Sequence, residues 1–311
     1  MAAEATRAGY GETLVELVEQ GMDIMAVEAD LSGSTTTNKL GKAYPDRLVN
    51  VGIAEQNMID VAAGLSLAGK VVFTGSFAAF GTGRCYDQIR NTVCYGNLNV
   101  KVAPTHAGVT VGPDGGSHQM LEDVSLMRGL PGMQVLVPAD YNAAKQAIAI
   151  AAKNDGPFYV RLGRAKVPQV YEPDFKLELG HAYVLREGTD VTLVANGVEV
   201  AQALKAADDL AAAGISAEVI DAFSVKPFDK ETLLASVKKT GCVVTCEEHS
   251  TVGGLGSAVA AILSENYPAP MERVGVRDQF GTSGDPDELL AEYGLDAAGI
   301  VAKAQAAVAR K

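Results

Sequence analysis

The chain contains no tryptophan, few aromatic residues of any kind, and fewer basic than acidic residues. Aromatic residues make up 6% of its 311 residues, whereas glycine occupies 33 positions. This composition favours an Ala- and Gly-rich α/β protein over an aromatic-rich β-sandwich. Lys and Arg number 26 against 38 Asp and Glu, which leaves a net charge of −12. We therefore expect no nucleic acid partner, because a phosphate backbone is bound by a basic face.

Long apolar runs and a secretion signal are also missing. No run of about 18 apolar residues occurs, so we expect no membrane span. The opening segment MAAEATRAGYGET has no basic leader followed by an apolar stretch, so we expect no secretion signal. The cysteines form no CxxC pair, and their spacing does not support a zinc site. We expect free thiols in a reducing cytoplasm.

Short apolar runs alternate with helical patterns over the whole chain, and this alternation predicts an α/β fold with two doubly wound, mainly parallel sheets. Runs rich in Val, Ile, Leu and Phe predict strands buried on both faces, over residues 23–30, 48–55, 70–77, 99–106, 133–140 and 157–164. Helical patterns lie between them, for example over residues 56–68, 83–95 and 141–153.

Residues 167–180 contain two prolines and little helical periodicity, and we interpret this segment as a linker or an edge crossing. The alternation then restarts, with strands predicted over 190–196, 217–225, 241–248 and 272–278. We therefore predict a first domain over residues 1–170 and a second domain over residues 180–311.

Chemically versatile side chains stand at the ends of the predicted strands of the first domain. These residues are Asp30, Glu55, Phe77, His106 and Arg164. The carboxyl ends of parallel strands open onto one edge of the sheet, where ligands bind. Any one of these residues alone could be an ordinary loop residue, but the five together predict a binding site at this edge.

The densest signal is the segment THAGVTVGPDGGSHQ, residues 105–119. It holds His106, Asp114 and His118 among four glycines. Glycines suit a loop whose backbone approaches a ligand closely, and histidines can relay protons near neutral pH. The spacing of the histidines does not match a metal site on a helix. From this segment alone, histidines of a solvated surface loop remain an equal alternative.

Taken in order, these segments resemble a known family. The first domain contains VEADLSGST, VGIAEQNM, GSFAAF, the loop above and YVRLGR, and together they resemble the pyrimidine-binding half of transketolases. The second domain contains IDAFSVKPFD, EEHSTVGGLGSAV and QFGTSGDPDELLAEYGL, which resemble the C-terminal domain of the family. The resemblance covers nearly the whole chain and is closest to the C-terminal subunit of a split transketolase.

One motif of thiamine diphosphate enzymes is missing. In that group, GDG followed by a downstream Asn binds the diphosphate and its divalent metal, and this sequence contains no GDG. The resemblance therefore implies that this chain holds only the pyrimidine end of thiamine diphosphate. Mg²⁺ and the diphosphate would be bound by a separate N-terminal subunit, in a heterotetramer of two copies of each chain.

The resemblance also implies roles for individual residues at the cofactor. Glu55 matches the glutamate that hydrogen-bonds a ring nitrogen of the aminopyrimidine. Phe77 and Phe80 match the aromatic wall that stacks on the same ring, and Asp30 would orient the cofactor. Gly83 occupies the position of a third aromatic residue in long-chain transketolases, so the wall is thinner, or Tyr86 completes it.

A second set of residues matches the sugar-binding positions of the family. His106, Ser34, Arg164 and Arg7 would bind the substrate phosphate, Asp114 a substrate hydroxyl, and His118 the region of the ketose carbonyl. A guanidinium suits a phosphate because it can donate to two oxygens at once. With its partner, the chain would transfer a two-carbon ketol unit from a ketose phosphate to an aldose phosphate.

Two alternatives remain open. The first is a pyruvate- or 2-oxo acid-using relative, such as deoxyxylulose phosphate synthase or the β subunit of a 2-oxo acid dehydrogenase. The second is a non-catalytic partner subunit that keeps the fold without the chemistry. Retention of Glu55, both histidines and Asp114 argues against the second alternative.

Overall fold

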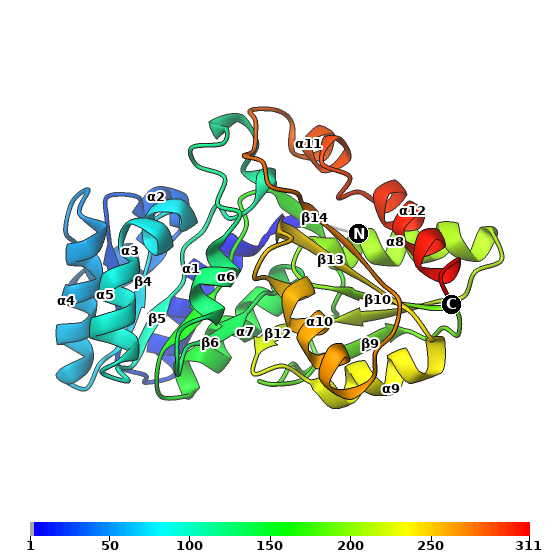
Figure 1. The fold of residues 1–311 in the computed structure, drawn as a ribbon. Coiled ribbons are helices and arrows are strands. Elements are labelled where there is room, and N and C mark those ends of the chain that lie inside the picture. Colours follow the sequence, from blue (N-terminus) through cyan, green and yellow to red (C-terminus); the bar gives the residue numbers. More distant parts are fainter. Residues whose placement is uncertain (1–2) are drawn as a thin grey trace.

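The predicted strands form two separate larger sheets in the computed structural model, which describes residues 3–311 (Figure 1). The first sheet has seven strands in the order β12-β6-β7-β5-β4-β2-β3. Its strands are β2 (Ile24–Glu28), β3 (Leu48–Asn50), β4 (Val71–Thr74), β5 (Val100–Val102), β6 (Gln134–Leu136), β7 (Phe158–Val160) and β12 (Ser224–Lys226). All neighbours are parallel except β12, which runs antiparallel to β6.

Helices cover both faces of this sheet because side chains of a strand alternate between the faces (Figure 1). On one face, Phe73 packs with Tyr10 and Ala147 from α1 (Thr6–Glu19) and α7 (Tyr141–Lys153). On the other face, Val72 packs with Met58 from α4 (Glu55–Leu67). The helix α1 was not predicted from the sequence, whereas α4 and α7 confirm the predicted helices.

The predicted helix over residues 83–95 is not one continuous α-helix. It is replaced by two π-helical segments that flank a short α-helix, namely η2 (Ala79–Arg84), α5 (Tyr86–Gln88) and η3 (Ile89–Cys94). π-helical turns are rare and are frequently found at functional sites. The remaining short elements are α2 (Ser32–Thr35), α3 (Asn38–Ala43), α6 (Asp123–Arg128), and the 3₁₀ segments η1 (Pro45–Arg47) and η4 (Val109–Asp114).

The second sheet has five strands in the order β14-β13-β10-β11-β9. They are β9 (Tyr183–Arg186), β10 (Val191–Ala195), β11 (Ala217–Asp221), β13 (Val243–Ser250) and β14 (Met271–Val276). Only the β9–β11 pair is antiparallel. The helices of this unit are α8 (Glu199–Ala212), α9 (Lys230–Thr240), α10 (Leu255–Asn266), α11 (Pro286–Glu292) and α12 (Ala297–Val308). The expected α/β class with two mainly parallel sheets is thus confirmed.

One predicted strand, residues 217–225, is wrong as a single element. The chain leaves the second sheet after Asp221, and Ser224–Lys226 then adds to the edge of the first sheet beside β6. Val225 is buried in the hydrophobic core between the first sheet and α4. A short apolar run satisfies burial in either sheet, so its pairing partner cannot be read from the local pattern.

The segment between the two units is tied to both of them. Its β8 (Lys166–Pro168) pairs antiparallel with β1 (Ala3–Ala5). Tyr171 is buried, its backbone N–H donates to Asp140 of the first unit, and its hydroxyl donates to Asp221 of the second. These bonds fix the crossing segment against both sheets.

A buried ion cluster also joins the two units. Arg161, beyond β7, donates to Asp123 at 2.7 Å and to the backbone oxygen of Glu248 at 2.9 Å. The Glu248 carboxylate accepts the backbone N–H of Thr110 at 2.6 Å. Since burial of an unpaired charge is costly, Glu248 of the second unit depends on Arg161 and Thr110 of the first, and Arg161 is shared between Asp123 of its own unit and Glu248 of the other.

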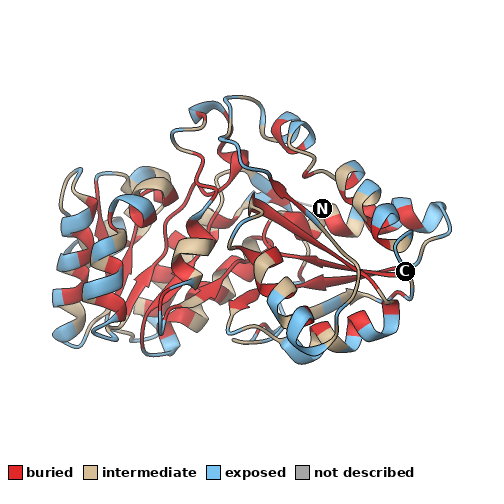
Figure 2. Cartoon of the chain, viewed as in Figure 1, coloured by how far each residue is buried: buried red, intermediate tan, exposed pale blue. Residues whose placement is uncertain are grey.

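Burial follows this layered arrangement. In Figure 2 the central strands of both sheets are buried, whereas the helices are exposed on their outer sides. All four cysteines, Cys85, Cys94, Cys242 and Cys246, are buried free thiols. No helix within residues 3–311 combines the length and the apolar character needed to cross a membrane.

Candidate functional site

The five strand-end residues singled out from the sequence all follow strands of the first sheet. Asp30 follows β2, Glu55 begins α4 after β3, Phe77 follows β4, His106 follows β5 and Arg164 follows β7. Because β2, β3, β4, β5 and β7 are parallel, all five lie toward one edge of the sheet.

The backbone at this edge is held in an uncommon conformation at three successive strand ends. Asp30, Ser76 and His106 have φ values of 64°, 75° and 63°. This left-handed region is unfavourable for residues with a Cβ and is used mainly where the surrounding structure requires it. The surrounding structure therefore holds the backbone at these strand ends in a conformation that the residues would not favour on their own.

Two phenylalanines and two histidines form a cluster of rings. The rings of Phe77 and His106 are stacked, with centroids 3.7 Å apart, and those of Phe77 and Phe80 are 6.2 Å apart. His118 meets the Phe80 ring edge-on at 5.2 Å. Tyr86 instead packs into the core on the α4 side of the sheet. The structure thus brings Phe77, Phe80 and both predicted histidines together.

Glu55 lies next to this ring cluster. Its residue is only 2% exposed, and its carboxylate accepts hydrogen bonds from the Nη1 atom of Arg84, at 2.9 Å to Oε1 and 3.0 Å to Oε2. The guanidinium carbon of Arg84 lies 4.5 Å from the centroid of the Phe80 ring. Arg84 therefore connects the buried acid with the aromatic residues.

Two arginines, Arg7 and Arg164, lie near His106. Arg7, from the first turn of α1, donates to the backbone oxygen of Ser34 at 2.8 Å, and Arg164 donates to the backbone oxygen of Val111 at 2.8 Å. Burial and the charge of Arg164 lower the pKa of Arg7. The structure therefore places both arginines near each other, and it engages Ser34 through its backbone oxygen.

His106 is buried beside these cations. Its Nδ1 lies 2.7 Å from the hydroxyl of Thr105. Burial, followed by the charges of Arg7, Arg164 and His118, lowers the pKa of His106 to about 3. The imidazole is therefore neutral at pH 7 and can act as a hydrogen-bond donor to an anion without carrying a charge of its own.

The remaining predicted residues lie on two loops. Asp30 is exposed, and its carboxylate accepts from the side-chain amide of Asn50 at 3.1 Å. Asn50 also accepts the backbone N–H of Gly52 at 3.0 Å, so Asp30 is tied to the turn that leads to Glu55. Asp114 ends η4 and is exposed, and no hydrogen bond or ion pair to its carboxylate occurs within residues 3–311.

The loop that carries Asp114 and His118 is held against the second unit. Gln119 donates to the backbone oxygen of Thr282 at 2.8 Å. A Cβ at Gly116 would lie 2.3 Å from the backbone oxygen of Gly281, so this close approach requires glycine. The second unit thereby fixes one side of the candidate site.

Three site residues were not identified from the sequence. Arg84 and Asn50 contact predicted residues directly. Glu28 ends β2, is buried, and accepts from the hydroxyls of Thr35 and Thr37 and from the Ser76 N–H. Burial raises the pKa of Glu28. In the sequence, Glu28 stands out as an acid inside a predicted buried strand, and Arg84 as a base four residues after Phe80. These two patterns could have indicated that both residues belong to the site.

The ring cluster and Glu55 fit an aminopyrimidine. Phe77 and Phe80 offer flat apolar surfaces, and a carboxylate has about four lone-pair sites, of which Arg84 occupies two. The described residues contain no group of three or more His, Cys, Asp or Glu arranged to hold a metal ion.

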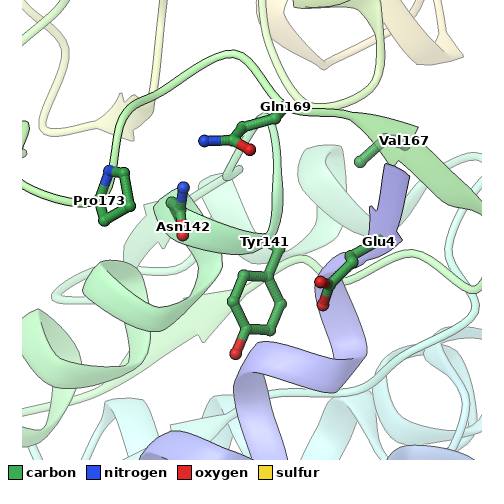
Figure 3. A pocket seen from close by; sticks show the side chains of 6 residues that line it. All are labelled: Glu4, Tyr141, Asn142, Val167, Gln169 and Pro173. Carbon is green, nitrogen blue, oxygen red and sulfur yellow. The ribbon is translucent and has the colours of Figure 1, made fainter. Parts of the chain in front are cut away.

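A small cavity elsewhere in the chain has different properties (Figure 3). Its volume is about 130 Å³, and it is lined by Glu4, Tyr141, Asn142, Val167, Gln169 and Pro173. The amide of Asn142 donates to the backbone oxygen of Tyr171, and the hydroxyl of Tyr141 donates to Glu12. These polar groups are thus already bound within the protein, whereas the exposed carboxylate of Asp114 at the strand-end site accepts no hydrogen bond within residues 3–311.

Comparison with protein families assigns both units. Residues 2–169 match the transketolase pyrimidine binding domain, and residues 180–300 match the transketolase C-terminal domain. The fold and the matched domains together define an α/β chain of the transketolase type.

The chain belongs to the transketolase family. It is 47% identical to a putative transketolase C-terminal section of Methanocaldococcus jannaschii, over 93% of this chain and 92% of the relative. It is 45% identical to the 6-deoxy-6-sulfo-D-fructose transketolase subunit SqwH of Clostridium sp. strain MSTE9, over 98% and 95% of the two chains. A solved structure described as a split gene transketolase, inactive beta4 tetramer, aligns over the full length of both chains with a TM-score of 0.91 and 51% identity.

Proposed function

We propose that this chain is the C-terminal subunit of a split, thiamine diphosphate-dependent transketolase. With a separate subunit that binds the diphosphate and Mg²⁺, it would transfer a ketol unit from a ketose phosphate to an aldose phosphate. The observation that carries this proposal is the placement of Glu55, the Phe77–Phe80 pair and the Arg7–Arg164 pair at one sheet edge, in a chain without GDG.

Glu55 and the two phenylalanines would bind the pyrimidine end of the cofactor. When bound, thiamine diphosphate supplies a carbon nucleophile that also acts as an electron sink. The protein's part is to keep the Glu55 carboxylate buried and fixed, so that it holds a proton at a ring nitrogen of the pyrimidine. Phe77 and Phe80 exclude water from that hydrogen bond and stack on the ring.

The cationic residues would bind the phosphate of each sugar. Arg7 and Arg164 supply charge-assisted hydrogen bonds, and the neutral imidazole of His106 supplies one further bond. Bringing a dianion to this position raises the proton affinity of His106, so phosphate binding and protonation of His106 would favour each other.

Asp114 and His118 would act nearer the reacting end of the sugar. The carboxylate of Asp114 is free to accept bonds from substrate hydroxyls. The His118 ring lies edge-on to Phe80, with its Nδ1 3.0 Å from the hydroxyl of Ser117. A histidine beside the pyrimidine wall can hold or move a proton at the ketose carbonyl oxygen.

Assembly follows from the missing half of the site. We infer a heterotetramer of two copies of this chain and two diphosphate-binding subunits in a reducing cytoplasm, consistent with four free thiols. The 51%-identical split transketolase structure is an inactive beta4 tetramer, which supports an isolated chain that self-associates and is inactive. The physiological sugars are either pentose phosphates or a specialised ketose of the kind named for SqwH.

The test is a reconstitution assay with thiamine diphosphate and Mg²⁺. The chain is assayed alone and then with its diphosphate-binding partner, using xylulose 5-phosphate and ribose 5-phosphate as the first substrate pair. We expect turnover only in the mixture. Turnover by the highly purified chain alone would contradict the proposal, and pyruvate-dependent turnover by the mixture would assign it to the pyruvate-using relatives.

A further inference from the structure

The contact between Arg84 and Glu55 distinguishes this site from a simple pairing of an acid with aromatic rings. Among residues 3–311, the hydrogen bonds to the Glu55 carboxylate come from Arg84 alone. Glu55 is 2% exposed, whereas the Arg84 side chain is 46% exposed. A carboxylate this deeply buried needs a hydrogen-bond partner, and Arg84 is the partner that the fold provides.

The same guanidinium also belongs to the aromatic wall. It lies 4.5 Å from the centroid of Phe80, which is a cation–π distance. Phe80 and Arg84 stand four residues apart in the π-helical segment η2, so their side chains leave the same side of it. Arg84 is therefore held by an aromatic ring on one side and by a buried acid at its tip.

Gly83, directly before Arg84, leaves the position of a third aromatic residue without a side chain. A Cβ at Gly83 would meet only the terminal carbon of Met120 within 4 Å, at 3.7 Å, so no side chain crowds this point of the wall. Tyr86 does not fill it, because its ring packs into the core on the α4 side. The planar group that lies against Phe80 here is the Arg84 guanidinium, which can stack as a ring does.

The geometry also leaves Glu55 able to serve a ligand. The Nη1 atom of Arg84 donates to both carboxylate oxygens at about the same length, 2.9 and 3.0 Å. About two of the four lone-pair sites of the carboxylate then remain for an N–H donor of a bound ring. The buried thiol of Cys85 lies near both side chains, and burial followed by the charge of Glu55 raises the pKa of this thiol to about 12, so it adds no charge beside Glu55 and Arg84.

We propose that Arg84 is a positioning residue for Glu55 and the third wall of the pyrimidine pocket, in place of an aromatic side chain. This inference rests on the proposed function, because it concerns how the chain holds the cofactor ring. Arg84 fixes the orientation of the Glu55 carboxylate, and its guanidinium plane closes the pocket beside Phe80.

The test measures binding as well as turnover in the reconstituted pair. The variants are Arg84→Gln, Arg84→Lys and Glu55→Gln, with Arg90→Gln as a matched control. Arg90 is exposed, and its guanidinium bonds only the neighbouring Asn91 side chain among the described residues. The readouts are the Kd of thiamine diphosphate by calorimetry in the presence of Mg²⁺, the near-UV circular dichroism of the bound cofactor, and kcat at saturating cofactor.

We expect Arg84→Gln to weaken thiamine diphosphate binding by about 10- to 100-fold and to lower kcat, because a charge-assisted bond to the acid is lost. Arg84→Lys should restore most of kcat but only part of the affinity, because an ammonium keeps the charge without the planar stacking surface. Arg90→Gln should match the unchanged protein in all three readouts.

Three results overturn the inference. The first is an Arg84→Gln protein with unchanged Kd, dichroism and kcat, and the second is an Arg84→Gln protein that binds the cofactor more tightly, since Arg84 would then compete with the pyrimidine. The third is an Arg84→Lys protein no better than Arg84→Gln. Glu55→Gln separates the two proposals: if it weakens binding while Arg84→Gln does not, only the role of Arg84 fails, and if neither does, the proposed function fails.

Discussion

The carboxyl edges of the two parallel sheets both carry acids, but the acids of the two edges have different partners. At the second edge Asp221, Glu247 and Glu248 are all buried. Asp221 accepts from the Tyr171 hydroxyl, and Glu247 accepts two backbone N–H groups at the start of α10. Glu248 takes part in the ion cluster with Arg161. The carboxylates of Asp221 and Glu248 thus hold the two units together, whereas that of Glu247 is bound within the second unit. Glu199, which begins α8 after β10, is also buried, and its carboxylate accepts no hydrogen bond within residues 3–311.

The first edge keeps capacity for a ligand. Among residues 3–311, no hydrogen bond reaches the carboxylate of Asp114, and that of Glu55 accepts bonds only from the half-exposed guanidinium of Arg84. Arg7 and Arg164 each donate to a backbone oxygen through one Nη atom, which leaves their other N–H groups for a ligand. Ligands commonly bind at the carboxyl edge of a parallel sheet, and this chain has two such edges, so this rule alone does not identify the functional one. An unpaired polar group that is also exposed, such as the carboxylate of Asp114, distinguishes the functional edge from the structural one, where the acids are buried.

The largest expected effect comes from removing the acid of the first edge. Glu55→Gln should lower the activity of the reconstituted pair by about 10²- to 10⁴-fold, because a neutral amide cannot hold the proton at the pyrimidine. The measurement is kcat/KM at saturating thiamine diphosphate. Glu247→Gln is the matched change at the second edge, and it should lower Tm while kcat per folded enzyme is kept. Equal activities of the two variants would remove the distinction between the edges.

The second prediction concerns the junction between the two units. Arg161→Met leaves Asp123 and Glu248 buried without their cation and should cost about 3–5 kcal/mol in the free energy of unfolding. Urea denaturation of the isolated chain measures this loss. The kcat of the folded, reconstituted fraction should not change. A variant as stable as the unchanged chain would show that the cluster does not hold the units together.

A smaller effect is expected at the cationic side of the first edge. Arg164→Gln should raise KM for phosphorylated sugars by about 10- to 100-fold, which corresponds to one charge-assisted bond. Unphosphorylated xylulose should show almost no change as donor. Arg186→Gln is the control, since Arg186 lies on β9 in a surface ion pair with Asp208. A similar rise in KM for both kinds of sugar would place Arg164 away from the phosphate.

The last prediction concerns the pH dependence of stability. The folded-state pKa of His106 is lowered from 6.5 to about 3, so between these values the unfolded chain binds a proton that the folded chain does not. This contribution to stability is present above pH 6.5 and is lost as pH falls toward 3. His106→Asn should reduce the slope of unfolding free energy against pH by about one proton in this window. Asn tolerates positive φ, which limits backbone strain.

The strands and the residues at their ends could be predicted because both leave local signals. A parallel strand covered by helices on two faces requires a continuous apolar run, and the first polar residue after the run marks the edge. Glu55 and His106 were found in this way. The actual strands of the first sheet span only three to five residues, and the remaining residues of each predicted run form the loops that build the site.

Other features left no local signal. Ser224–Lys226 joins the first sheet although it lies in the second half of the chain, and Arg84 reaches Glu55 across 29 residues of sequence. The helical periodicity around residues 83–95 did not distinguish π-helical from α-helical winding. Each of these features depends on which surfaces meet after folding, and local residue patterns do not encode that choice.

The sequence by itself determined the α/β class, the two mainly parallel sheets, and the membership of this chain in the transketolase family. These features could be predicted because buried strands, strand-end acids and glycine-rich loops each have a recognisable local sequence pattern. Only the tertiary structure decided which of the two carboxyl edges keeps its polar groups available, and which side chain holds Glu55. The physical reason is that hydrogen bonds between distant segments satisfy one set of buried charges and leave the other set available for a ligand.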